Sequence, residues 1–368
     1  MIGCGLCGYQ TGAVQCLEVR LSLAALFANH LKGHDLKTGE SAKLGVRTLW
    51  NRAKGWPLCV SFEVTHSCVA DCRHCDKGGL KEEARLLTPE DYHRYSLDLK
   101  PGVCQLSGGE PLLRQDLEGI VRAVKRRSGL PLVVLVSNWW LMTEQRYLAL
   151  MEAGVSLFSV SLDFPDERHD DFRRIPGLFG KMSELIPHLA SKYRYHNICL
   201  NSALTHANFK EIPGLVAKAE EWKVPISFSA YSCLRTGDTS LCIRAAEDLS
   251  VLREHIDWLK HHKRRSTTVM NSDYILDQTY RFFAEGGLGG CQAGRRFLVV
   301  RPDGLINACS MWPDRQYASR KEAAAGFRPT REACDQCYVS IRASTERPLG
   351  RLIAENFKIA AKTPSFDR

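Results

Sequence analysis

Six short apolar runs between residues 56 and 235 constrain the fold of this chain more than any other feature. They lie at residues 58–65, 103–108, 131–138, 156–163, 197–204 and 225–231, and helical patterns follow at 88–98, 113–127, 143–152, 179–192 and 208–221. The runs are continuously apolar, which is typical of parallel strands covered on both faces. Six strand–helix units are too few for an eightfold barrel, so the pattern predicts an α/β fold, a partial (β/α)6 TIM-like barrel open on one side.

The rest of the chain divides around this barrel. We expect an N-terminal helical extension at residues 1–55, the barrel at 56–235, a helical connector at 236–285, a hairpin-built glycine- and cysteine-rich module at 286–345, and a tail at 346–368. Before the barrel, an apolar stripe near helical spacing (Leu17, Leu21, Ala24, Ala25 and Phe27) accompanies an excess of basic residues. Such helices commonly pack on a neighbouring domain, and contact with a membrane surface is the alternative.

The cysteine content and the charge indicate the cellular compartment and the kinds of partner to expect. The chain has 368 residues, a formal net charge of +9 and 15 cysteines. We find no secretion signal and no membrane-spanning run, so we expect a cytoplasmic protein, membrane-associated only through its N-terminal helices. Disulfide frameworks are rare in a reducing compartment, so the cysteines are expected as metal ligands or buried thiols. The basic residues form no dense block, and nucleic-acid binding is not expected.

Polar or ligating side chains follow five of the six strands. In chain order they are Cys68, Cys72 and Cys75, then the SGGEP segment from Ser107 to Pro111, then Ser137 and Asn138, then Ser161 and Asp163, and then Asn201. The carboxyl ends of parallel barrel strands meet at one rim, where active sites form. The sequence therefore predicts one site that gathers these groups.

The three cysteines after the first strand lie within eight residues of one another. Thiolates in such a loop suit an iron–sulfur cluster, and three ligands leave one iron of a cubane open to a small molecule. Zinc is the alternative; it would need a fourth ligand, for which His66 or His74 could serve, but structural zinc sites favour paired CxxC knuckles.

CxxxCxxC after the first strand, GGEP after the second and SLD after the fourth together resemble the radical S-adenosylmethionine (radical SAM) superfamily over residues 56–235. The resemblance implies that Cys68, Cys72 and Cys75 ligate a 4Fe–4S cluster whose open iron chelates SAM. Its implied SAM-binding residues are His74 near the adenine, Ser107, Gly108, Gly109 and Glu110 at the methionine amino group, Ser161 and Asp163 at the ribose and methionyl ends, and Asn138 and Asn201 as further contacts.

The third strand departs from the family pattern, because SNWW stands where a TNG-like turn is usual. Trp139 and Trp140 either shape the substrate pocket or pack in the core beneath a loop. Asn201 has a similar alternative, since an asparagine inside a strand can simply satisfy neighbouring polar groups.

The last cysteine group resembles the auxiliary-cluster modules, named SPASM or twitch, of the same superfamily. Cys291 is followed after twelve residues by Gly304, four further residues and Cys309, and Cys334 and Cys337 add a CxxC. The resemblance implies one auxiliary 4Fe–4S cluster on these four cysteines, with an electron-relay or structural role. Zinc is the alternative here too.

The remaining cysteines carry weaker signals. Cys4, Cys7 and Cys16 either bind a metal or are unligated thiols near a chain end. Five others are scattered (Cys59, Cys104, Cys199, Cys233 and Cys242), and the four in or beside apolar runs are expected to be buried as small hydrophobes.

The resemblance implies an enzyme that reductively cleaves SAM to a 5′-deoxyadenosyl radical and abstracts hydrogen from an unactivated C–H bond. It also implies an electron donor such as flavodoxin or ferredoxin. The basic amphipathic start favours a lipid or another hydrophobic substrate. Maturation of a ribosomally made peptide is the alternative, and a non-catalytic zinc or redox protein is a remote one that leaves GGEP and SLD unexplained.

Overall fold

The computed structural model describes residues 38–125, 129–193, 196–329 and 334–348. One sheet runs through them in the order β6-β5-β4-β3-β2-β1-β7-β8-β9. Its first six strands are β1 (Cys59–Thr65), β2 (Val103–Gly108), β3 (Leu132–Ser137), β4 (Leu157–Ser161), β5 (Ile198–Leu204) and β6 (Ile226–Ala230). Each pairs in parallel with the next, so the predicted α/β partial barrel is confirmed.

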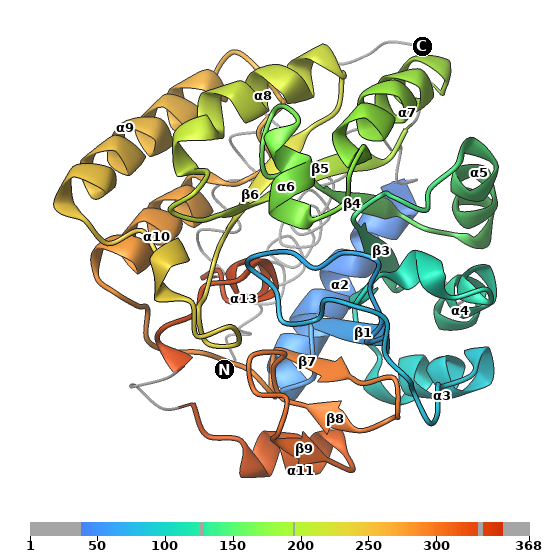
Figure 1. The fold of residues 1–368 in the computed structure, drawn as a ribbon. Helices are drawn as coiled ribbons and strands as arrows, with labels where there is room; N and C mark the ends of the chain where they lie inside the picture. Colours follow the sequence, from blue (N-terminus) through green and yellow to red (C-terminus); the bar gives the residue numbers. More distant parts are fainter. Residues whose placement is uncertain (1–37, 126–128, 194–195, 330–333, 349–368) are drawn as a thin grey trace, which may run out of the picture.

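Helices surround the convex side of this sheet (Figure 1). They are α3 (Pro89–Leu99), α4 (Leu117–Val124), α5 (Glu144–Ala153), α7 (Leu178–Lys192) and α8 (Ile212–Glu221), followed by α9 (Ala246–His262) and α10 (Asp273–Ala284). The short helix α6 (Arg168–Arg173) instead lies in front of the ends of β4 and β5 (Figure 1). Helix α3 begins with a capping box, because Thr88 Oγ1 accepts from the Asp91 amide and the Asp91 carboxylate accepts from the Thr88 amide. Short 3-10 turns lie at Pro111–Leu113, Phe209–Glu211 and Thr239–Leu241.

The two faces of the barrel strands differ in chemistry. Residues that face the helices, such as Phe62, Leu106 and Phe158, are fully buried in one large hydrophobic core. The alternate residues point to the concave side, where many of those in β2 to β6 are half-buried, whereas every residue of β1 is buried. The convex face of the sheet therefore packs in the hydrophobic core, and the concave face is available for a functional site.

The C-terminal module is joined to the barrel more closely than the sequence predicts. The expected hairpins are present as β7 (Phe297–Val300), β8 (Ile306–Asn307) and β9 (Gln316–Tyr317), followed by α11 (Arg320–Gly326) and α13 (Ser340–Thr345). However, β7 pairs in parallel with β1, from Cys59↔Phe297 to Phe62↔Val300. The module thus extends the barrel sheet at its β1 edge, a pairing that no local pattern reveals.

Helix α2 (Thr38–Lys54) packs on the barrel. Leu44 lies in a small core with Leu130 and Leu132, and Asn51 donates from Nδ2 to the Pro57 and Lys100 carbonyls at 2.7 and 2.9 Å. The apolar stripe from Leu17 to Phe27 lies outside the described residues, as do Cys4, Cys7 and Cys16. Within the described ranges, no helix combines the length and hydrophobicity needed to cross a bilayer.

Candidate active site

The loop that carries Cys68, Cys72 and Cys75 begins directly after β1. The loop folds back on itself, because the Cys68 amide donates to the Gly79 carbonyl at 3.0 Å and the Cys75 amide donates to the Cys72 carbonyl at 3.1 Å. Cys72 is buried, Cys68 is half-buried and Cys75 is exposed. The three thiols therefore sit in one compact turn at the rim of the barrel.

Two of these sulfurs accept hydrogen bonds. Cys68 Sγ accepts from the Ala70 amide at 3.4 Å and from Asn138 Nδ2 at 3.9 Å, and Cys72 Sγ accepts from Arg173 Nη1 at 3.8 Å. By contrast, the buried Cys199 thiol donates to the Leu200 carbonyl. Hydrogen bonds to sulfur are a feature of iron–sulfur ligation, so Cys68 and Cys72 fit a cluster. Burial raises the pKa of Cys68 to about 12, but a bound cation deprotonates a coordinating thiol.

Arg173 was not among the predicted site residues, yet it links two of them. Its guanidinium lies 2.6 Å from the Asp163 carboxylate and also reaches Cys72. Asp163 is completely buried, and its second carboxylate oxygen accepts from the Ala203 amide at 3.0 Å. Burial would raise the pKa of Asp163, but Arg173 holds it below its ordinary value. The structure thus places Asp163 behind Arg173, as the partner of a buried cation.

The end of α6 holds the cysteine loop in a second way. The Phe172 and Arg173 carbonyls accept from the Arg73 and Asp71 amides at 3.2 and 3.4 Å. His74 stacks on Phe172 with ring centroids 4.9 Å apart, and burial, followed by Arg173, lowers the His74 pKa to about 4. This six-residue helix is too short for periodicity to predict, which is why the sequence does not reveal the contact.

Gly108 and Gly109 bring the end of β2 against the cysteine loop. The Gly109 amide donates to the Thr65 carbonyl and the Glu110 amide donates to the Ser67 carbonyl, both at 2.8 Å. A Cβ on Gly108 would lie 2.1 Å from the Thr65 oxygen, and one on Gly109 would lie 2.0 Å from the Ser67 oxygen. The family resemblance assigns both glycines to the methionine amino group of SAM, and in the structure their close neighbour is the backbone just before Cys68.

Glu110 anchors the neighbouring strand end. It is 1% exposed, and its carboxylate accepts from Ser137 Oγ and the Asn138 amide, both at 2.8 Å, and from the Leu112 amide at 3.1 Å. Burial raises the pKa of Glu110, although these donors oppose the shift. The contacts place Asn138 where its side chain meets Cys68.

The two tryptophans have different surroundings. Trp139 is fully buried and meets Phe158 edge to face, with ring centroids 5.7 Å apart. Trp140 is half-buried, and the Lys181 ammonium lies 5.3 Å from its ring centroid. Trp139 is therefore the core tryptophan of the two alternatives, and only Trp140 reaches the surface.

Ser107, Ser161 and Asn201 lie on the concave face of the sheet and are half-buried there. Ser107 Oγ is 2.8 Å from Ser61 Oγ. Asn201 donates from Nδ2 to Ser227 Oγ at 2.8 Å and accepts from Ser229 Oγ at 3.2 Å. The concave face has a hydroxyl- and amide-rich lining, and its half-buried members include Gln105, Ser107, Ser159, Ser161, Asn201, Ser227 and Ser229, beside Val134, Val136 and Ala203.

The four C-terminal cysteines are all buried. Cys291, Cys309 and Cys334 share a core cluster with Phe297 of β7. Cys309 Sγ accepts from the Met311 amide at 3.3 Å, and Cys291 and Cys337 likewise accept from the amides two residues further on. Burial raises the pKa of Cys309 well above its ordinary value, and the thiols of the other three raise it further. The four predicted ligands therefore lie near one another, since the other three thiols all act on Cys309.

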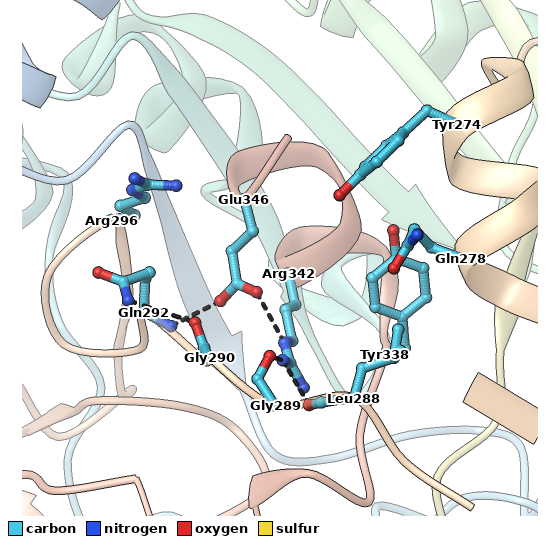
Figure 2. A pocket seen from close by; sticks show the side chains of 10 residues that line it. All are labelled: Tyr274, Gln278, Leu288, Gly289, Gly290, Gln292, Arg296, Tyr338, Arg342 and Glu346. Carbon is cyan, nitrogen blue, oxygen red and sulfur yellow. Dashed lines mark hydrogen bonds and ion pairs between the residues drawn. The ribbon is translucent and has the colours of Figure 1, made fainter. Parts of the chain in front are cut away.

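Arg342 of α13 organises this centre (Figure 2). It is 1% exposed, and Nη2 donates to the Leu288 and Gly289 carbonyls at 2.7 and 2.8 Å. Nη1 donates to the Cys334 and Cys337 carbonyls, and Nε donates to Glu346 at 2.8 Å. One buried guanidinium thus fixes the segments on both sides of the cysteines, and a pocket of about 260 Å³ lies beside it.

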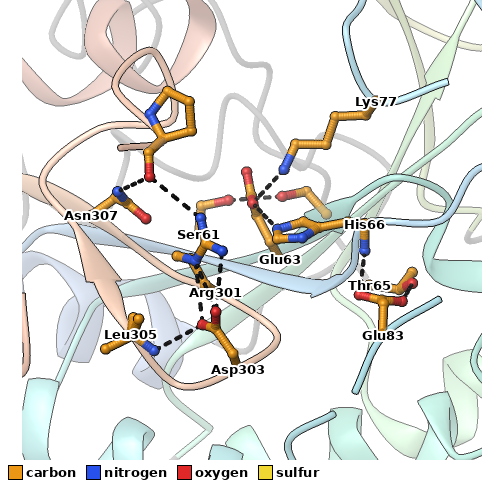
Figure 3. Close-up of polar contacts among 12 residues, drawn as sticks. Ser61, Glu63, Thr65, His66, Lys77, Glu83, Arg301, Asp303, Leu305 and Asn307 are labelled. Atoms are coloured by element: carbon orange, nitrogen blue, oxygen red, sulfur yellow. Dashed lines mark hydrogen bonds and ion pairs between the residues drawn. The ribbon is translucent and has the colours of Figure 1, made fainter. Parts of the chain in front are cut away.

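A second pocket, of about 190 Å³, lies between the two cysteine centres. It is lined from the cysteine loop, β1, the segment after β6 and the β7–β8 hairpin, including Asp76 next to Cys75 and Ser310 next to Cys309. Glu63 pairs there with Lys77 at 2.5 Å and His66 at 3.0 Å (Figure 3). Burial would raise the pKa of Glu63, but the His66 hydrogen bond and Lys77 lower it to about 2.

Among the residues that the structure describes, no three His, Cys, Asp or Glu side chains converge as ligands of a single metal ion.

Comparisons with known proteins agree with this geometry. Residues 62–213 match the radical SAM superfamily model. The AdoMet-dependent heme synthase of Oleidesulfovibrio alaskensis is 33% identical over 309 residues, which cover 76% of this chain and 77% of that protein. The PqqA peptide cyclase of Granulibacter bethesdensis is 26% identical over 262 residues, 69% of this chain and 67% of the cyclase.

The fold also matches solved structures. Streptococcus suis SuiB bound to precursor peptide SuiA superposes with a TM-score of 0.58 at 15% identity, covering 84% of this chain and 76% of SuiB. The motifs, the parallel part-barrel and the heme synthase that is 33% identical over 76% of this chain support the same conclusion. The chain belongs to the radical SAM superfamily, whose enzymes use a 4Fe–4S cluster and S-adenosylmethionine.

Proposed function

We propose that this radical SAM enzyme modifies a peptide, with a SAM-binding cluster on Cys68, Cys72 and Cys75 and an auxiliary cluster on Cys291, Cys309, Cys334 and Cys337. The N–H donors aimed at Cys68 and Cys72 support the first assignment. The four buried thiols gathered beside Arg342 support the second. When bound, the first cluster and SAM together supply a 5′-deoxyadenosyl radical that removes hydrogen from a C–H bond.

The protein's own part in this chemistry is positioning. Arg173 holds Cys72 from one side and Asn138 holds Cys68 from another. Gly109 and Glu110 tie the end of β2 to the residues before Cys68. The half-buried serines and Asn201 on the concave face supply hydrogen bonds to SAM or to the substrate, and an electron donor such as flavodoxin or ferredoxin completes the proposal.

The concave face carries the substrate assignment. Its half-buried side chains are mostly hydroxyls and amides, and they contribute no charge. A peptide presents an amide donor or acceptor at every residue and can add hydrogen bonds to such a wall, whereas a hydrocarbon chain offers none beyond those that the side chains of the wall make with one another. The wall therefore favours a peptide over the lipid that the N-terminal amphipathic pattern suggests.

The comparisons support the same choice. One relative is a peptide cyclase, and the SuiB structure holds a precursor peptide. No reported relative supports a lipid. The segment between the cysteine centres also offers charged groups to a substrate, since Lys77, Arg235 and Arg301 line the pocket there with Glu63 and Asp76.

A heme-type substrate is the second candidate, because two AdoMet-dependent heme synthases are 33% and 37% identical to this chain. Tetrapyrroles carry a wide apolar ring, which the serine-rich wall fits less well than it fits a peptide.

Hydrogen transfer decides between these substrates. Cells grown in deuterated medium would be extracted and separated into peptide, tetrapyrrole and lipid fractions, and each would be incubated anaerobically with enzyme, unlabelled SAM and dithionite. We expect deuterium in 5′-deoxyadenosine only with the peptide fraction, and loss of transfer after protease digestion of that fraction. Cys72→Ala is the control for background. Transfer from the tetrapyrrole or lipid fraction alone would refute the peptide assignment.

A further inference from the structure

Cys233 and Cys242 lie side by side after β6, although eight residues separate them in the sequence. The Gly237 amide donates to the Cys233 carbonyl at 2.8 Å, and the Cys242 amide donates to the Thr239 carbonyl at 3.1 Å. These two turns reverse the chain, and the Cys233 thiol is near enough to help raise the pKa of Cys242. Both side chains pack against one small core of Phe164, Phe172, Tyr231 and Leu241.

Neither cysteine has a part in the proposed cluster sites. Both are free and only half-buried, unlike Cys59, Cys104 and Cys199, which are buried. The sequence offers no reason to separate them from the buried structural cysteines, because their spacing matches no metal motif. A thiol pair in contact and within reach of solvent has different chemistry from a single buried thiol.

The loop between them connects the two cysteine centres. Arg235 pairs with Asp76, next to Cys75, at 2.5 Å. Ser232 donates to the Gln336 carbonyl, between Cys334 and Cys337, at 2.7 Å. Any constraint on residues 232–242 therefore acts on a segment that touches both proposed cluster loops.

We propose that Cys233 and Cys242 form a reversible disulfide, with a peroxide as the oxidant, and that this bond locks the loop between the two cysteine centres. The peroxide converts the Cys233 thiol to a sulfenic acid and leaves as water. The Cys242 sulfur then attacks the sulfenic sulfur and the S–O bond breaks. The hydroxyl group of the sulfenic acid takes the Cys242 proton and leaves as a second water. The pair loses two electrons to the peroxide, and an S–S bond of about 2.05 Å replaces the thiol contact.

The environment of Cys242 supports this order of events. Burial and the neighbouring Cys233 thiol raise the pKa of Cys242 to about 11, so it remains a thiol at neutral pH. A raised pKa suits Cys242 to the second step, since a thiol next to a sulfenic acid condenses with it.

Peptide mapping tests the proposal on the anaerobically reconstituted full chain. The protein would be treated with one equivalent of hydrogen peroxide, alkylated and digested with trypsin. Cleavage after residues 223, 235 and 244 separates Cys233 in peptide 224–235 from Cys242 in peptide 236–244. We expect the two peptides to be disulfide-linked, and dithiothreitol to return both as free thiols. Full alkylation of both cysteines, or Cys233 recovered as an unlinked sulfinic acid, would overturn the proposal.

Two controls separate this bond from damage and from a silent cross-link. The Cys233→Ser variant should give no disulfide-linked peptides, and in its reduced form it should still cleave SAM. Alkylation of Cys68 or Cys309 in the peroxide-treated protein would show that a cluster has been lost. Hydrogen exchange of residues 231–244 should slow on oxidation in the wild-type protein and stay constant in Cys242→Ser. Equal exchange before and after oxidation of the wild-type protein would refute the lock.

Discussion

At the scale of single residues, the site depends on buried charges that no motif names. Asp163 belongs to SLD and was expected at SAM, but it is wholly buried against Arg173, which in turn reaches Cys72. A buried ion pair contributes little when intact, yet removing one partner leaves the other charge unpaired. Mutations at this pair should therefore be strongly non-additive.

Arg173→Gln and Asp163→Asn should each lower the free energy of unfolding by about 3–5 kcal/mol, and the double variant should lose less than their sum. Urea unfolding of the three variants measures this. Arg168→Gln is the control, because its pairs with Asp166 and Glu211 are exposed and each is worth about 1 kcal/mol or less. Additive losses in the double variant would show that the pair is not coupled.

His169 makes stability depend on pH. It is completely buried, its Nδ1 accepts from the Asp163 amide, and burial followed by Arg173 lowers its pKa to about 3. The unfolded chain therefore binds a proton below pH 6.5 that the folded chain refuses. The resulting loss in the free energy of unfolding is absent well above pH 6.5. It grows by about 1.4 kcal/mol per pH unit as the pH falls from 6.5 towards 3.

His169→Asn keeps an acceptor for Asp163 but no longer titrates. Its free energy of unfolding should fall less steeply than that of wild type between pH 7.5 and 5.5. Urea unfolding at several pH values checks this, and parallel curves for the two proteins would contradict the assignment.

At the scale of elements, close backbone approaches assemble the rim. Strand β2 meets the cysteine loop only because Gly108 and Gly109 lack side chains, and α6 fixes the same loop from the opposite side. The strands and their order follow from the sequence, because apolar runs and turn signals are local. The contacts of α6 with the cysteine loop and the pairing of β7 with β1 join segments far apart in the chain. No local sequence pattern therefore predicts them.

Gly109→Ala should displace the cysteine loop, since its Cβ would lie 2.0 Å from the Ser67 oxygen and backbone cannot yield cheaply. We expect a loss of about 1–3 kcal/mol in unfolding free energy and reduced iron at the SAM cluster. Gly180→Ala is the matched control, because nothing lies within 4 Å of its added Cβ in α7 and a helical alanine is preferred by about 0.5–1 kcal/mol. Equal iron content in the two variants would contradict this role for Gly109.

At the scale of the whole molecule, one continuous sheet carries both cysteine centres. The sequence predicts a separate C-terminal module, whereas β7 continues the sheet beside β1. Arg342, which holds the auxiliary loops together, is invisible in the sequence because a lone arginine on a short helix has no signature. Substrate identity also lies beyond the motifs, since the polar wall is assembled from alternate residues of several strands.

Iron content and SAM cleavage, measured on the same samples, test the central claim most directly. After anaerobic reconstitution, two four-iron clusters predict about eight irons per wild-type chain and dithionite-dependent formation of 5′-deoxyadenosine. Cys72→Ala should lower the iron content and abolish 5′-deoxyadenosine, whereas Cys334→Ala should lower the iron content and retain SAM cleavage uncoupled from substrate. Equal loss of cleavage in both variants, or retention of zinc without cleavage in the wild-type protein, would contradict two separate clusters with one SAM site.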